Sequence, residues 1–466
     1  MNLVTDKWVP VYIGNKTERF SLKEVYTRMA EIRSLVGNGI EKVAILRLLL
    51  AITQAALDGP VDDADWEKCR GRITAESLKY LNKWIPKFEL YGSFLQMSCI
   101  KMKEEVKSTN KLLFTIASGD NHTLFFNGLK NGEADIALGL LVIQLFDCSG
   151  LIKTPEFSWA GETVPKLTAA DGSLFANILL TVIEKDNLLD TLYYNMSCKT
   201  WFAEAKISWG KPFWEYPECK PSEITLDQKS SYLSCLVPMS RGITLTKGAK
   251  NMVFVEGYTH PEYPIYRDPM ASLRVKVTKK STEYGYVKCH IDKAMWRELE
   301  SLTDISTVDN HIRGVWALRR LMTKNEPFIL TVAAMIYGPN LAKKQAALDW
   351  SIPVNDLGDL HQKTQAFIKD SEKYNAGIYQ ATKECLNEKG KGHSYSKNTH
   401  AAMLNTARSI YWSSVEITFM DYCRKGFTDY KKSLKACARK AYDLCCANIN
   451  RHAVSKGAIV LDNFLQ

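Results

Sequence analysis

Two acidic residues and a lysine stand close together near residue 130. Lys130 is followed by Glu133 and Asp135, a combination that would suit a metal-dependent nuclease. Residues i and i+2 of a helix lie on different faces, however, so the two carboxylates would not converge on one ion. No further metal ligands accompany them in the sequence. A metal-dependent nuclease that uses Glu133 and Asp135 is therefore an alternative interpretation and not the first one.

Sequence motifs of other enzyme classes are absent. The chain contains no GxSxG, no HExxH, no GxxxxGK followed by Ser or Thr, and no GxGxxG. His122 and His290 have no partner at metal-ligand spacing. Of the 12 cysteines only Cys445 and Cys446 are neighbours, and no CxxC occurs. We therefore predict a non-catalytic protein with reduced thiols, without a metal ion or a cofactor.

The stretch from Gly119 to Gly150 combines three kinds of sequence. Turn-prone residues precede the aromatic pair Phe125 and Phe126, a polar run follows, and the stretch then becomes apolar from Ile136 to Phe146. The length of the apolar block suits a buried helix better than a membrane span. A polar loop with aromatic residues beside such a helix could probe a large ligand. The alternative is that the two phenylalanines pack in the core and the loop only connects.

Length and charge narrow the class of protein. At 466 residues the chain exceeds the usual size of one domain. Its net charge of +10 permits an anionic partner such as a nucleic acid. The first residues lack the apolar core of a secretory signal, and no apolar run reaches about 18 residues. We therefore predict a cytoplasmic protein that does not contact a membrane.

The hydrophobic pattern predicts a mixed first part and a helical second part. We expect a hairpin over residues 1–20, a strong helix at 41–57 and another helix at 174–187. A β-rich part is predicted over 205–290, with strands at 232–237 and 243–246. A second hairpin is predicted around Gly338-Pro339-Asn340. Long helical patterns then cover 359–389, 396–423 and 428–448.

These patterns define the fold class. We predict an α+β N-terminal domain of mixed helices and β-rich segments over residues 1–355, followed by an all-α C-terminal helical bundle over 356–466. Residues 357–466 hold 17 Lys and Arg against 10 Asp and Glu, so seven of the ten net positive charges lie there. The segment after Asn448 is short, which predicts a truncated last helix.

Several short motifs recur in one order along the chain. They cover residues 2–11, 44–50, 125–127, 146–150 and 257–261, and the last is followed by Pro269. Each motif is weak by itself, but their order and spacing hold over essentially the whole chain. On these residues the chain resembles the CasA family, the large subunit of the type I-E CRISPR surveillance complex called Cascade.

The resemblance implies a non-catalytic subunit that recognises the PAM, helps to open the target duplex and docks an effector helicase-nuclease. Its implied partners are the guide RNA, the other Cascade subunits, double-stranded target DNA with a PAM, and that helicase-nuclease. Because the guide RNA reads the target by base pairing, the protein needs to read only a few base pairs. Readers of this family work largely from the minor groove.

Two loops of the family correspond to segments on either side of the apolar block. The loop with Phe125, Phe126 and Asn127, close to Lys130, resembles the family's loop that anchors the subunit near the 5′ end of the guide. The segment after Phe146 corresponds to a glycine-rich loop that enters the minor groove. It contains Gly150, Lys153 and Gly161 here. This loss of glycines bears on which PAM is read, since bare backbone approaches DNA more closely than bulky residues can.

Two further elements correspond to a wedge and to a minor-groove lysine. The turn with Asn340, Leu341 and Lys343 lies where the family has a hairpin wedge, and Leu341 stands at the family's glutamine position. Lys247 and Lys250 fall roughly at the lysine position, although a solvated hairpin turn is the competing interpretation.

The cysteines of the β-rich part differ from one pattern in the family. Some members carry a cysteine cluster there, but Cys219 and Cys235 do not reproduce it, so no zinc is expected.

A scaffold subunit that joins the complex without reading DNA stays a further alternative.

Overall fold

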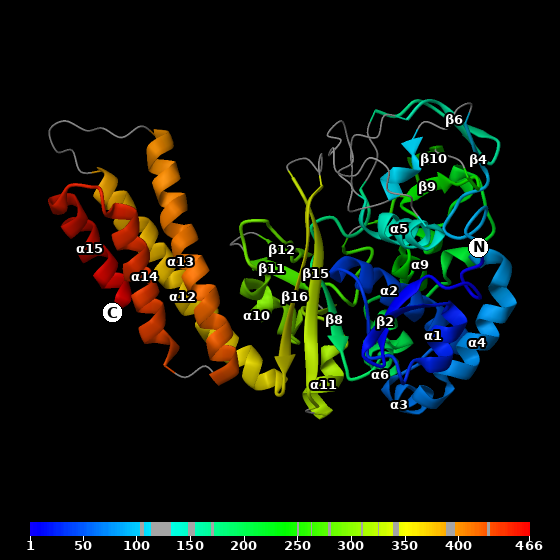
Figure 1. The fold of residues 1–466 in the computed structure, drawn as a ribbon, viewed down its shortest axis with the longest axis horizontal. Coiled ribbons are helices and arrows are strands. Elements are labelled where there is room, and N and C mark those ends of the chain that lie inside the picture. The colour runs from blue at the N-terminus through cyan, green and yellow to red at the C-terminus, as the bar shows by residue number, and fades with distance from the viewer. Residues whose placement is uncertain are drawn as a thin grey trace. The chain divides into compact units, whose positions relative to one another are not determined.

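The computed structural model describes residues 1–102, 107–112, 132–147, 154–168, 172–248, 251–261, 263–277, 281–308, 311–324, 326–338, 344–387, 397–425 and 429–466 (Figure 1). The chain divides into two compact units, Met1–Leu357 and Gly358–Gln466. The first unit combines helices with small sheets, and the second consists of helices. This confirms the predicted fold class, an α+β part followed by an all-α part.

The N-terminal hairpin forms as predicted. Strand β1 (Val9–Ile13) pairs with β2 (Lys16–Phe20) and with β3 (Ser34–Leu35). The turn residues Gly14 and Asn15 both have positive φ, which glycine and asparagine tolerate better than other residues. Helix α1 (Leu22–Arg28) then starts at a capping box that Ser21 makes with Glu24.

Helix α2 (Gly39–Leu57) is the central helix of the first unit. It starts at a capping box between Asn38 and Glu41, and residues on all its sides are buried. This is the pattern of a helix enclosed by its neighbours. The neighbours are α4 (Ile73–Trp84), α5 (Glu133–Phe146), α9 (Tyr232–Leu236) and the strands β15 (Phe328–Tyr337) and β16 (Lys344–Val354).

A three-stranded antiparallel sheet, in the order β16-β15-β8, covers one side of α2 (Figure 1). Strand β8 (Leu180–Glu184) contradicts the predicted helix over 174–187. The run Leu-Thr-Val-Ile is apolar and β-branched, and a short buried run of this kind cannot be assigned by periodicity. The core behind the sheet includes Val332, Ala334 and Ile336 of β15.

The β-rich part was predicted only in part. Strand β9 (Arg241–Thr244) overlaps the predicted strand at 243–246, and it pairs in antiparallel fashion with β10 (Asn251–Glu256). Residues 232–237 were predicted to be a strand, but they form the short helix α9. The segment is fully buried, so its continuous apolar character suits either structure.

The other elements of the first unit are short. They are α3 (Asp63–Cys69), β4 (Ile100–Lys101), β5 (Lys107–Ser108), β6 (Phe157–Trp159), β7 (Glu162–Val164), α6 (Leu188–Asn195), α7 (Lys199–Glu204), α8 (Leu226–Ser230), β11 (Leu273–Val277), β12 (Thr282–Tyr286), α10 (Leu299–Thr303), β13 (Thr307–Val308), β14 (His311–Ile312) and α11 (Leu318–Lys324).

The described residues of the second unit form four helices: α12 (Leu357–Asn387), α13 (Lys397–Lys425), α14 (Tyr430–Cys446) and α15 (Arg451–Leu465). The last helix is shorter than the first two, but it is packed closely. A Cβ atom on Gly457 would lie 2.0 Å from the Tyr442 hydroxyl and 2.6 Å from the Ala381 carbonyl oxygen, so only glycine allows α15 to approach its neighbours this closely. Among the described residues no helix is long and apolar enough to cross a membrane.

Candidate nucleic-acid interface

Two of the sequence-predicted site residues, Gly161 and Lys247, lie in the described part of the chain. The others lie outside the described residues: Phe125, Phe126, Asn127, Lys130, Gly150, Lys153, Lys250, Asn340, Leu341 and Lys343. The described residues next to each predicted loop show how the two ends of that loop are held.

Helix α5 connects two of these loops. It begins at Glu133, directly after the segment with the aromatic pair, and it ends at Phe146, directly before the segment with Gly150. Ten of its residues are buried, as expected for an apolar block enclosed by the core. The predicted buried helix is confirmed, and it fixes the position of one end of each loop.

The residue that precedes the first loop is packed against α5. Leu112 is buried, and a Cβ atom on Gly139 would lie 2.2 Å from the Leu112 carbonyl oxygen. Such an approach is possible only because Gly139 has no side chain. The two ends of the segment between Leu112 and Glu133 are thus held against one helix.

A substitution at Gly139 tests this contact. Alanine in a helix interior is normally favoured over glycine by about 1 kcal/mol, but here the added methyl group would collide with backbone. We expect Gly139→Ala to lower the free energy of unfolding by about 1–3 kcal/mol, measured by chemical denaturation. The control is Gly71→Ala, because a Cβ atom there has no heavy atom within 4 Å. Equal stability of the two variants would contradict the close approach.

The end of α5 is held by a buried ion pair. The Arg241 guanidinium donates from Nε to the Asp147 carboxylate at 2.9 Å and from Nη2 to the Asp147 carbonyl oxygen at 2.8 Å. The two side chains are 1% and 0% exposed. Gln144 adds two bonds to the Arg241 backbone, each 2.8 Å long. Asp147 is the last described residue before the segment with Gly150, so this pair fixes where that segment begins.

The carbonyl of Phe146 makes a second contact at this end of α5. It accepts a 2.7 Å hydrogen bond from the hydroxyl of Tyr337, the last residue of β15. The β15–β16 register shifts between Ile336 and Tyr337, an irregularity that redirects a side chain. Tyr337 also donates its backbone N–H to Asn177 Oδ1 at 2.6 Å. The starts of the predicted minor-groove loop and of the predicted wedge are therefore bonded to each other.

Gly161 lies at the tip of a hairpin that the sequence did not predict. Strands β6 and β7 pair around Ala160 and Gly161, which both have positive φ. Within the segment after Phe146, which was predicted to be a loop, the described residues thus include a hairpin. Its hairpin is held by the ring contact of Trp159 with Tyr258 and by a hydrogen bond from Ser222 to Glu162. A Cβ atom on Gly161 would meet nothing within 4 Å, so the tip is open to solvent and to a ligand.

Lys247 is exposed in the turn after β9, next to Gly248 with its positive φ. This matches the interpretation of the segment as a solvated hairpin turn.

Glu133 and Asp135 occupy the first turn of α5. Carboxylates are favoured there by the helix dipole. Asp135 forms an ion pair with Arg19 at 2.6 Å. Burial, and next the interaction with Glu133, raise the pKa of Tyr91. In the described parts of the chain no three His, Cys, Asp or Glu side chains are placed to share a metal ion. Both carboxylates thus have structural partners.

His260 belongs to one of the motifs that carry the family resemblance. It is buried, its Nδ1 lies 2.7 Å from the Lys229 carbonyl oxygen, and burial lowers its pKa to about 4. A histidine in this setting is neutral at physiological pH. The motif therefore acts through packing and not as a charged contact.

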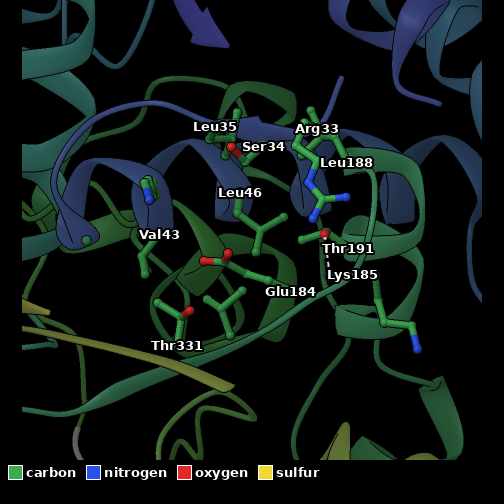
Figure 2. Close-up of a pocket in the computed structure, with 13 residues that line it drawn as sticks. Arg33, Ser34, Leu35, Val43, Leu46, Glu184, Lys185, Leu188, Thr191 and Thr331 are labelled. Carbon is green, nitrogen blue, oxygen red and sulfur yellow. Dashed lines mark hydrogen bonds between the residues drawn. The ribbon is translucent and has the colours of Figure 1, made fainter. Parts of the chain in front are cut away.

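A pocket lies between α2, β3, β8 and β15 (Figure 2). Figure 2 shows the Glu184 carboxylate between Leu46 and Thr331, while the Lys185 amine points away from the pocket. Lys185 is bonded to Glu326 at 3.1 Å and to the Pro327 carbonyl oxygen. None of the sequence-predicted site residues lines this pocket, so it is separate from the candidate interface.

The residues that hold the loops were missed by sequence reasoning. Arg241 and Asp147 are charged residues beside apolar runs. This pattern usually marks the solvent-exposed end of a helix or strand. Tyr337 was placed at the start of the turn that corresponds to the family's wedge, but it was not predicted to hold that turn. Of these residues only Asp147 could have been singled out from the sequence, because it directly follows the apolar block and directly precedes the predicted loop.

Comparisons with known proteins agree with this architecture. The family model for CRISPR-associated protein Cse1 matches residues 2–447. CasA (Cse1) of Thermus thermophilus is similar in structure, with a TM-score of 0.80 and 19% identity over 100% of this chain and 99% of that one. Cse1 of Thermobifida fusca has a TM-score of 0.74 and 19% identity, over 100% and 97% of the two chains.

A chain of a CRISPR RNA-guided surveillance complex also matches, with a TM-score of 0.75 and 16% identity over 100% of this chain and 99% of that one. A search of curated proteins finds no match. At these identities the structural likenesses establish the fold, while the family match covers nearly the whole sequence. The resemblance to the CasA family is thereby confirmed, and the chain belongs to the CRISPR-associated Cse1 family.

Proposed function

We propose that this chain is the large, non-catalytic subunit of a CRISPR RNA-guided surveillance complex in the cytoplasm. In that complex it recognises the PAM, helps to open the target duplex and docks an effector helicase-nuclease. The family match and the structural likeness to a chain of such a complex support the coarser part of this proposal. PAM recognition and duplex opening form the finer part of the proposal. They require that several DNA-contacting loops lie close together.

The observation that carries the finer part is the bond between the ends of α5 and β15. The Tyr337 hydroxyl and the Phe146 carbonyl are 2.7 Å apart, so the segments after Phe146 and after Tyr337 start side by side. The segment with Phe125 ends at the other end of the same helix. A reader that senses a PAM in one groove and opens the adjacent base pair needs such proximity, because the two events concern neighbouring steps of one duplex.

Within this proposal each predicted residue has a role. Phe125, Phe126, Asn127 and Lys130 hold the subunit near the guide. Gly150, Lys153, Gly161, Lys247 and Lys250 approach the minor groove. Asn340, Leu341 and Lys343 act at the first unpaired step, where inserting an apolar side chain costs a few kcal/mol of stacking.

The nuclease alternative is less well supported, because Asp135 is engaged by Arg19. A scaffold subunit would have the same fold and the same partners in the complex. It differs from the proposed reader in one property, since its DNA binding would not depend on the sequence beside the target.

Assembly and PAM dependence test the proposal together. We expect the chain, expressed with the other subunits and a guide, to co-purify with guide-length RNA, and the complex to select particular sequences from duplexes with randomised flanking bases. If the complex binds all flanking sequences equally well, the chain is a scaffold subunit and not a PAM reader. If the chain purifies alone and cleaves DNA, the nuclease alternative is favoured. For the nuclease, Glu133→Ala with Asp135→Ala should abolish that cleavage.

A further inference from the structure

The pocket between α2, β3, β8 and β15 combines an apolar wall with charged side chains. Its wall is formed by five aliphatic residues that are each at most 7% exposed: Leu35, Val43, Leu46, Val182 and Leu188. Side chains of this kind ordinarily fill the space between a helix and a sheet completely. Here a space is left among them, and charged residues of the same elements border it, so the pocket offers both an apolar and an ionic surface to a ligand.

Glu184 places a carboxylate on the side of β8 that faces α2. Alternate residues of a strand lie on the same face, so Glu184 shares its face with Val182, which belongs to the apolar wall. Figure 2 shows the Glu184 carboxylate between Leu46 and Thr331. Within the described parts of the chain its side chain forms no ion pair and no hydrogen bond. A carboxylate at such a position is stabilised when water or a ligand supplies hydrogen-bond donors to it.

Three cations border the same pocket, and two of them are directed elsewhere. Arg33 is paired with Asp186 at 3.5 Å, and the Lys185 amine points away from the pocket (Figure 2). Lys42, in the first turns of α2, is the third. Its side chain has neither an ion pair nor a hydrogen bond to any residue that the structure describes. Lys42 and Glu184 are therefore opposite charges that border one pocket without being paired with each other.

We propose that this pocket binds a small zwitterion, a free α-amino acid with a short aliphatic side chain. The ammonium group of the ligand pairs with Glu184, its carboxylate pairs with Lys42, and its side chain packs on the apolar wall around Leu46. Each charge of the pocket thereby gains a counter-charge, while burial of the aliphatic group adds a hydrophobic contribution to the affinity. This site goes beyond the proposed function and does not depend on it.

Three matched ligands test the charge requirement by calorimetric titration of the full chain. L-Valine carries both charges, isobutylamine lacks the carboxylate, and isovalerate lacks the amine. We expect L-valine to bind with a dissociation constant of about 1 mM, a value within reach of a ligand of this size. Isobutylamine and isovalerate should each bind about tenfold more weakly, because each leaves one charge of the pocket without a partner.

Two variants test the residues. Glu184→Gln and Lys42→Met keep the approximate size of each side chain and remove its charge, and each should weaken the binding of L-valine about tenfold. Glu184→Gln should leave the affinity for isovalerate unchanged, since that ligand has no amine. The controls Glu31→Gln and Lys79→Met remove exposed charges elsewhere, so they should leave the affinity for L-valine unchanged.

Three results overturn the proposal: no binding of L-valine at about 20 mM, equal affinity for L-valine and isobutylamine, or an affinity for L-valine that Glu184→Gln does not change. Each of them assigns the pocket to water alone. The proposed function is tested separately, by the co-purification of guide RNA and the selection of flanking bases, so its failure would leave this site untouched.

Discussion

Replacing Arg241 by Met is expected to lower the free energy of unfolding by about 3–5 kcal/mol, because it leaves the Asp147 carboxylate buried without its cation. The two side chains are 1% and 0% exposed, and Arg241 Nε lies 2.9 Å from Asp147 Oδ2. The loss should appear in chemical denaturation of the protein. Because Asp147 leads into the segment predicted to enter the minor groove, selection of flanking bases by the complex should weaken as well.

Two controls separate the buried charge from a general effect of losing arginine. Arg28 forms an exposed ion pair with Glu31 at 2.7 Å, so Arg28→Met should cost about 0–1 kcal/mol. Adding Asp147→Asn to Arg241→Met removes the unpaired charge and should recover part of the stability. A cost below about 1 kcal/mol for Arg241→Met alone would contradict the view that this ion pair holds the start of the loop.

The second large effect concerns the basic helix α14 of the bundle. Lys431, Lys432 and Lys435 lie on its first turns, with Lys431 and Lys432 exposed and Lys431 3.3 Å from Asp370. If these lysines contact phosphates, replacing all three by Glu should reduce the slope of log affinity against log salt by about 2.7. Between 50 and 200 mM salt the wild-type complex would then lose about 40-fold more affinity for target DNA than the variant does.

The matched control reverses three exposed lysines of the first unit, Lys79, Lys83 and Lys87. It changes the net charge by the same amount, so it corrects for the overall field of the protein. An equal change of slope in both variants, or no change in either, would show that the α14 lysines are solvated surface residues that do not contact phosphates. The measurement is DNA binding by the assembled complex at a series of salt concentrations.

Local sequence patterns were sufficient to predict the helices and hairpins that are determined by residues close together in the chain. The N-terminal hairpin follows from Gly14-Asn15 between two strand patterns, and α2 follows from its long apolar run. Its cap at Asn38, which precedes the predicted start of the helix at Glu41, was not predicted. The bundle follows from three long helical patterns, and its last helix is the one element there that was underestimated. The family itself was recognisable, because the order of its weak motifs is preserved along the chain.

Short buried segments could not be assigned in this way. Leu180–Glu184 and Tyr232–Leu236 are both mainly apolar segments of five residues, yet one is a strand and the other a helix. Strand β8 is a strand because β15 offers it a hydrogen-bonding edge, in the register Leu330 to Ile183. The choice depends on a partner almost 150 residues away, so it is not contained in the run itself.

The sequence by itself determined the fold class, the family and the positions of the segments predicted to meet nucleic acid. Tertiary structure alone decided what holds those segments: Arg241 on Asp147 across 94 residues, Tyr337 on Phe146 across 191, and Gly139 against Leu112. Each of these contacts joins groups whose partner is distant in the chain. A charge or a hydroxyl next to an apolar run is equally compatible with solvent and with a buried partner, and only the folded arrangement supplies the partner that makes burial favourable.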